Sequence, residues 1–95
     1  MADRAGPITA DSKTVTAAGT PEFLTTDSVP CSAVIVRAKD ANTGVVYIVD
    51  SGDNTKKYPG AGLPAGETIT LPIGNPAKIK IDVSVSAEGV DWLAV

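Results

Sequence analysis

The chain contains no histidine and a single cysteine among its 95 residues. Histidine is the commonest general base and the commonest protein ligand of transition metals, so its absence excludes a Ser-His-Asp triad and a Cys-His nucleophile. Cys31 cannot form a disulfide within the chain, and its place at the start of a β-prone segment is typical of a small core residue. We therefore expect a protein that is not an enzyme, holds no cofactor and needs no oxidising compartment to fold.

Concentrated positive charge and long apolar runs are also missing. Eight basic and eleven acidic residues give a formal charge of −3, and the largest basic run is Lys56-Lys57, whereas nucleic-acid binding needs a concentrated basic patch. No apolar stretch approaches the length of a membrane span, and residues 1–7 lack the apolar core of a signal peptide. We expect neither nucleic acid nor a membrane as a partner, and synthesis in a cytoplasm without Sec-type secretion.

What the sequence has in abundance is β-branched residues. Val, Ile and Thr together number 28 against four Leu, and nine Gly and seven Pro divide the chain into short elements. The clearest pattern lies in residues 77–86, where apolar and polar side chains alternate. The apolar ones are Ile79, Ile81, Val83 and Val85, and the polar ones are Lys78, Lys80, Asp82, Ser84 and Ser86. This alternation predicts a strand with one dry face and one solvated face.

Shorter patterns of the same kind predict an all-β fold, a small antiparallel β-sandwich of seven to eight strands, jelly-roll-like or immunoglobulin-like. Residues 1–13 show no periodicity and predict a flexible N-terminal arm, so the sandwich domain is expected over residues 14–95. Strands are expected at 14–17, 22–25, 31–39, 45–49, 68–73, 77–86 and 90–95.

Turn residues predict how some of these strands pair. Residues 40–44 predict an antiparallel hairpin of 31–39 with 45–49, and residues 74–76 predict another of 68–73 with 77–86. Residues 50–66 are rich in Gly, Pro and polar side chains, so they are expected to be irregular, with Tyr58 and Leu63 folded back over one end of the core.

Three local features have some properties of binding motifs but the wrong context. Asp50 and its neighbours fit a calcium loop poorly, because the twelfth position of that loop would be Ala61 instead of a glutamate. Glycines 60, 62 and 66 precede a predicted strand, whereas a phosphate cradle needs a helix N-terminus. Trp92, on the last strand, is expected in the core or in an interface more than on a sugar-binding platform. Because the segment at Asp50 fits a calcium loop poorly, we expect no metal site.

Five short motifs share their order with one known group of proteins. Residues 17–21 read Ala-Ala-Gly-Thr-Pro, residues 31–38 read Cys-Ser-Ala-Val-Ile-Val-Arg-Ala, and residues 41–48 read Ala-Asn-Thr-Gly-Val-Val-Tyr-Ile. Gly60, Leu63, Gly66 and Glu67 then form a turn before an apolar strand, and residues 90–94 read Val-Asp-Trp-Leu-Ala. With these motifs residues 14–95 resemble a group of small virion proteins of tailed bacteriophages. The chain departs from that pattern at Val49-Asp50, where members usually carry a glycine.

The resemblance implies a β-sandwich structural protein of a phage particle, and our leading hypothesis is a capsid decoration (cement) protein on the exterior of the virion, made in the cytoplasm of the host bacterium. Such a protein would bind across neighbouring major capsid protein subunits, and we expect a homo-oligomer, with a trimer as the first candidate because a capsid threefold position would template it. The candidate residues are Arg4 and Ile8 for capsid contact, and Ile35 and Tyr47 for contact between subunits.

Two alternatives to the capsid hypothesis stay open. The first is a tail- or fibre-associated module that binds host surface glycans, which exposure of Trp92 or Tyr58 beside Asp and Asn side chains would favour. The second is a cellular sandwich domain with an unrelated partner.

Overall fold

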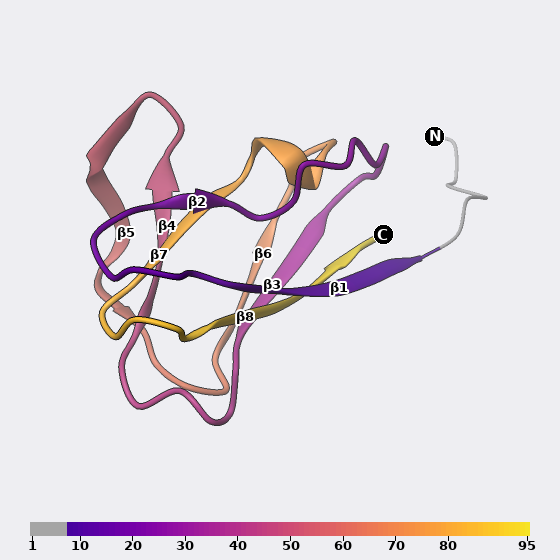
Figure 1. Cartoon of the computed structure of the whole chain (residues 1–95). Coiled ribbons are helices and arrows are strands. Elements are labelled where there is room, and N and C mark those ends of the chain that lie inside the picture. The colour runs from indigo at the N-terminus through magenta and orange to yellow at the C-terminus, as the bar shows by residue number, and fades with distance from the viewer. Residues whose placement is uncertain (1–7) are drawn as a thin grey trace.

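A computed structural model describes residues 8–95 as two packed antiparallel sheets, which together contain eight strands (Figure 1). The strands are β1 (Thr9–Thr14), β2 (Glu22–Phe23), β3 (Val34–Ala38), β4 (Val46–Asp50), β5 (Asp53–Leu63), β6 (Thr68–Leu71), β7 (Lys80–Val83) and β8 (Gly89–Ala94). A 3₁₀-helix, η1 (Pro76–Lys78), precedes β7. Within these residues no helix is long or apolar enough to cross a bilayer.

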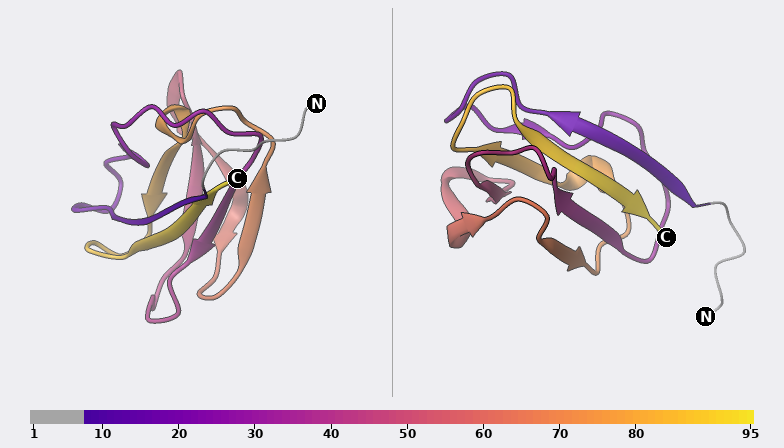
Figure 2. Two further views of the ribbon diagram at one scale, coloured as in Figure 1. Left: turned by 90° about the vertical axis from the view of Figure 1, so that its right-hand side faces the viewer. Right: turned by 90° about the horizontal axis from the view of Figure 1, so that it is seen from below.

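The strand order identifies the sandwich as a jelly roll. Sheet A has the order β1-β8-β3-β6 and sheet B the order β2-β7-β4-β5, and Figure 2 shows them as two layers. The pairs β1–β8, β2–β7, β3–β6 and β4–β5 are nested like the two arms of one long hairpin that has been rolled up, which is the jelly-roll arrangement. In an immunoglobulin sandwich the first strand would pair with the second. The predicted all-β sandwich is confirmed, in its jelly-roll form.

The core lies between the sheets and consists mainly of β-branched residues. Alternate residues of β3 point inward, and Val34, Val36 and Ala38 are fully buried as the sequence predicts. Ile69 and Leu71 of β6 pair with Val36 and Val34 and pack against this core, again on the predicted face. At roughly 25 cal/mol per Å² of apolar surface removed from water, this layer is the main source of stability.

Both predicted hairpins are wrong. The segments 31–39 and 45–49 contribute to β3 in sheet A and β4 in sheet B, and β6 and β7 likewise lie in opposite sheets. Alternation fixes which face of a strand is buried, but it does not fix which strand pairs with it. The connections after β3 and β6 cross from one sheet to the other, so neither forms a hairpin. In the described part of the chain, only β4 and β5 are consecutive strands that lie in the same sheet.

The segment predicted as irregular contains the longest strand. β5 runs from Asp53 to Leu63 along the edge of sheet B, with register shifts against β4, and edge positions tolerate Gly and Pro that a central strand would not. Leu63 is buried against the core, but Tyr58 is 65% exposed and does not fold back over it.

Two predicted boundaries also change. The predicted arm, residues 1–13, overlaps β1, which pairs with β8 from Thr9↔Ala94 to Thr14↔Gly89, so the sandwich begins at Thr9 and not at residue 14. Residues 1–7 lie outside the described part of the chain. The predicted strand 77–86 is shortened to Lys80–Val83, because η1 precedes it and a turn follows it, leaving Val85 40% exposed.

Candidate functional site

Sheet A carries an apolar cluster on its outer face, away from the core. The inward direction of Val34 and Val36 places Ile35 and Arg37 on this outer face, and the β3–β8 register sets Ile35 opposite Leu93 and Arg37 opposite Asp91. Ile35 and Leu93 are both half-buried, although no strand of the described chain covers them. They lie on the two central strands of the sheet, which therefore carry an apolar row next to the charged row of Arg37 and Asp91.

The same face continues toward the two ends of the described chain. The register sets Ala10 of β1 opposite Leu93, and alternation places Ile8 on the same face as Ala10. Ile8 is 67% exposed. At this end Val95 N–H donates to the Ala33 carbonyl at 2.9 Å, and Figure 2 shows the C-terminus beside β1. We call the side chains of Ile8, Ala10, Ala33, Ile35, Leu93 and Val95 the terminal apolar face.

The sequence-predicted contact residues are only partly brought together. Ile8 and Ile35, chosen for different contacts, both belong to the terminal apolar face. Tyr47 does not, because it lies in β4, where it pairs with Asp82 on the outer side of sheet B. Arg4 lies outside the described residues. The partner of Ile35, Leu93, was missed, since only the β3–β8 register reveals that the two are neighbours.

An ion pair with a buried carboxylate joins strands on the outer side of sheet B. Asp82, predicted to be solvated, is fully buried, and its Oδ2 lies 2.8 Å from Lys57 Nζ. The N–H groups of Val83 and Gly19 donate to its Oδ1 at 2.8 and 3.0 Å. Burial raises the pKa of Asp82, but the hydrogen bonds from Lys57, Val83 and Gly19 outweigh it and leave the pKa below its ordinary value of 3.8. The ammonium group of Lys57 also lies 5.2 Å from the centre of the Tyr47 ring. Because Tyr47 and Asp82 are engaged within the chain, these side chains form a stabilising cluster.

A second carboxylate fixes the loops at one end of the sandwich. Glu88 accepts hydrogen bonds from the N–H of Thr43 at 2.7 Å and the N–H of Gly44 at 2.9 Å, and from the Thr43 hydroxyl at 2.8 Å. These bonds stabilise its charged form and lower the pKa of Glu88. The β3–β4 crossing is thereby attached to the turn that leads into β8.

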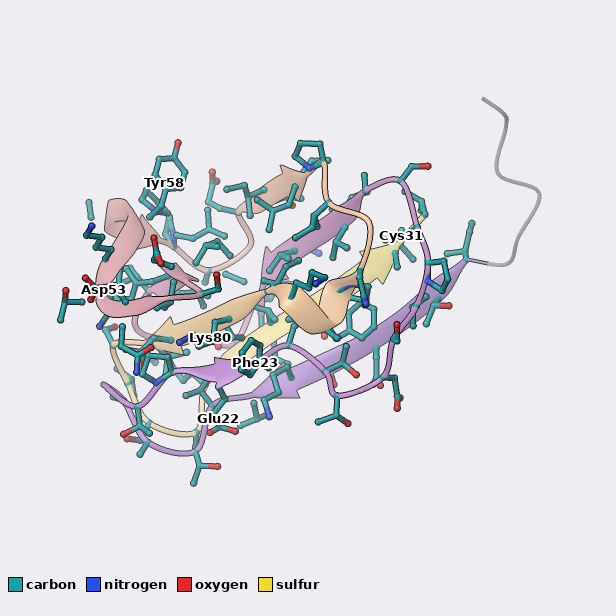
Figure 3. All side chains as sticks on the ribbon, turned by 90° about the horizontal axis from the view of Figure 1, so that it is seen from above. Glu22, Phe23, Cys31, Asp53, Tyr58 and Lys80 are labelled. Atoms are coloured by element: carbon teal, nitrogen blue, oxygen red, sulfur yellow. The ribbon has the colours of Figure 1, made fainter. Side chains whose placement is uncertain are left out.

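A shallow groove of about 300 Å³ lies beside the β4–β5 hairpin. Ile48, Val49 and Asp50 line it from β4, and Lys56, Lys57 and Tyr58 line it from β5. Figure 3 shows Tyr58 projecting from β5, whereas Phe23 and Lys80 lie together on another part of sheet B. The ring of Tyr58 is thus the most exposed aromatic surface in the described chain.

The remaining sequence candidates are structural in this arrangement. Trp92 is 4% exposed in the core, as predicted, although its Nε1 has no hydrogen-bond partner among the described residues. Cys31 is half-buried and its thiol donates to the Ile73 carbonyl, with an S···O distance of 3.3 Å. Asp53 accepts from both the N–H and the hydroxyl of Thr55, as turn residues do. Over residues 8–95 no three His, Cys, Asp or Glu side chains gather as a metal site.

Comparisons with protein-family models, with curated proteins and with solved structures yield no match to this chain.

Proposed function

We propose that this chain is a non-enzymatic structural protein of a phage virion, which decorates the capsid exterior and stabilises it by binding across major capsid protein subunits. The observation that carries the proposal is the terminal apolar face, with the half-buried Ile35 and Leu93 at its centre and the exposed Ile8 at its edge. Contiguous apolar surface of this kind is typical of protein–protein contact sites. The motifs shared with phage virion proteins, and a jelly roll of the type that also occurs in viral capsid domains, supply the class of partner.

The mechanism is added burial across the seams of the shell. A decorating subunit that binds the assembled lattice, but not separated capsid subunits, stabilises the assembled state by mass action. Many copies on one particle multiply this effect, because each seam opens only when its bound subunits dissociate. A rigid sandwich suits this role, since little conformational entropy is lost when a preformed face docks.

The experiment that tests the proposal mixes the purified protein with expanded, undecorated capsids and measures bound protein per capsid. We expect saturable, stoichiometric binding, weakened by Ile8→Asp. The matched control is Val85→Asp, because Val85 is also an exposed aliphatic residue but follows β7, outside the terminal apolar face. Absence of binding to any head would overturn the proposal. Equal binding by both variants would remove Ile8 from the contact.

A second candidate function is a tail- or fibre-associated module that binds host surface glycans. The observation that favours it is the exposure of Tyr58 beside Asp50 and Lys56, because a flat aromatic ring next to polar groups suits one face of a sugar. Trp92 offers no such surface. A glycan-array signal that Tyr58→Ala abolishes and Phe23→Ala preserves would establish this function, whereas no signal from the unmodified chain would reject it.

A further inference from the structure

We propose that two copies of this chain associate face to face through the outer face of sheet A, related by a twofold axis that runs parallel to the strands between β3 and β8. This inference does not depend on the capsid proposal, because it concerns the purified protein alone.

The arrangement of side chains on this face is self-complementary under such an axis. β8 and β3 are the two central strands of sheet A, and the axis exchanges them. Ile35 of one copy then lies over Leu93 of the partner subunit, and Leu93 lies over Ile35 of the partner subunit, since the two residues share one row across the sheet. The next row behaves in the same way. Arg37 and Asp91 are opposite each other within one copy, so each faces its oppositely charged counterpart in the other.

Within one copy, Arg37 of this second row has an ion-pair partner and Asp91 has none among the described residues. The Arg37 guanidinium turns toward the loops, where its Nη2 lies 2.8 Å from Asp40 and its Nε donates to the Gly66 carbonyl at 3.2 Å. Asp91 is exposed and takes part in no ion pair with residues 8–95. The Arg37 side chain remains 49% exposed, so a guanidinium edge is available to a second copy. Twofold docking therefore places each Asp91 beside the exposed edge of Arg37 of the partner subunit, in the row next to the apolar pair.

The outer strands allow two such faces to approach closely. The axis also exchanges β1 and β6, which brings Ala10 to Thr70 of the partner subunit and Ser12 to Thr68 of the partner subunit. All four side chains are short, so none prevents the two sheets from reaching the spacing of about 10 Å that is typical of stacked sheets. Between them a hollow of about 210 Å³, lined in part by Ile35 and Leu93, is open to the apolar side chains of the second copy.

The size of the face predicts a weak dimer. Four strands about 4.8 Å apart and five residues of about 3.4 Å each give a footprint of roughly 300 Å² per copy. Stable interfaces typically bury about 800 Å² of accessible surface per partner. We therefore expect association in the micromolar to millimolar range, which becomes significant where copies are held close together.

Sedimentation equilibrium over about 5 µM to 1 mM tests this inference, with charge reversal as the specific probe. The unmodified chain is expected to show a concentration-dependent monomer–dimer equilibrium. Arg37→Asp and Asp91→Arg should each raise Kd at least about tenfold, because each puts like charges opposite one another at two places. The double variant should recover most of the affinity, since it restores opposite charges in exchanged positions. Ile35→Asp should abolish the dimer.

Lys56→Asp is the matched control, because it reverses an exposed charge on β5, in the other sheet. Each variant is compared only if its circular dichroism and Trp92 fluorescence match those of the unmodified chain. A monomer at every concentration, a trimer, or a dimer in which single and double charge variants behave alike would each overturn the inference. Capsid binding is measured separately with undecorated capsids, because a dimer that covers Ile35 and Leu93 competes with the capsid for the same face.

Discussion

Lys57 of β5 and Asp82 of β7 form an ion pair across the outer side of sheet B, with 2.8 Å between Nζ and Oδ2, although β4 lies between their strands. The carboxylate is buried, while 29% of the lysine side chain is exposed. Asp82 also holds the loop between β1 and β2 through the N–H of Gly19. This pair therefore joins three segments that are distant in sequence, and it stabilises the sheet that lies opposite the terminal apolar face.

Replacing Lys57 by Met should destabilise the fold. The substitution keeps much of the aliphatic volume but leaves the Asp82 carboxylate buried without its cation, at an expected cost of about 1–3 kcal/mol in the free energy of unfolding. Urea unfolding followed by Trp92 fluorescence measures the change. Lys56→Met is the control, because Lys56 is exposed on the same strand, and it should fall within about 0.5 kcal/mol of the unmodified chain. If Lys57→Met and the unmodified chain have equal free energies of unfolding, the ion pair adds no stability.

Acid should weaken the fold through the carboxylates that accept hydrogen bonds. The pKa of Glu88 is lowered by the N–H groups of Thr43 and Gly44, and the pKa of Glu22 by the N–H of Thr16 and by Lys13. The pKa of Asp82 is also below its ordinary value. A carboxylate whose pKa is lower in the folded chain adds stability above its unfolded pKa and loses it as the pH falls through its folded pKa.

The unfolding midpoint should therefore be steady near neutrality and decline below pH about 4.5, the ordinary value for glutamate. Urea unfolding at a series of pH values measures this decline. Glu88→Gln should make the decline shallower, because one of the titrating groups is gone. A urea midpoint of unfolding that stays constant down to pH about 3 would contradict this expected loss of stability in acid.

Gly89→Ala should disrupt the pairing of β1 with β8. A Cβ at Gly89 would lie 1.9 Å from the Lys13 carbonyl oxygen, a backbone atom that moves only if the two strands separate. We expect a loss of about 1–3 kcal/mol, measured by thermal or urea unfolding. Gly60→Ala is the matched control in β5, since a Cβ there meets no atom within 4 Å, and it should be nearly neutral. Equal effects of the two substitutions would mean that the approach of Lys13 and Gly89 is not required.

Two N-terminal deletions should distinguish the stability that β1 contributes from any that the residues before it contribute. A deletion that ends at Ser12 removes four residues of β1, with their pairings to residues 91–94, and should lower Tm by at least about 5 °C. A deletion that ends at Pro7 leaves every described pairing of β1 in place and serves as the control. Differential scanning calorimetry compares the two. If both shortened chains melt at the same temperature, β1 adds no measurable stability.

The composition and the alternation of side chains were sufficient to predict the class of fold and much of the core. Val34, Val36 and Ala38 point inward, Trp92 is buried, and Ile69 and Leu71 face the core, because the pleat of a strand assigns alternate residues to opposite faces wherever that strand lies. The absence of histidine was equally visible in the sequence. Nothing in those patterns, however, states which strand lies next to which.

Long-range packing determines which strands are neighbours, and the main errors of the sequence-based prediction concern these neighbours. β3 and β4 follow each other along the chain but lie in different sheets, while β1 pairs with β8 from the far end of the sequence. The polar alternation of 77–86 predicted a solvated Asp82, yet Lys57 from β5 covers it. In the same way Ile8, Ile35 and Leu93 are scattered in sequence, and only the register of β1, β8 and β3 gathers them on one face. Local sequence specifies which way a side chain points, but the rolled topology decides what it meets, because those contacts join residues that no local pattern relates.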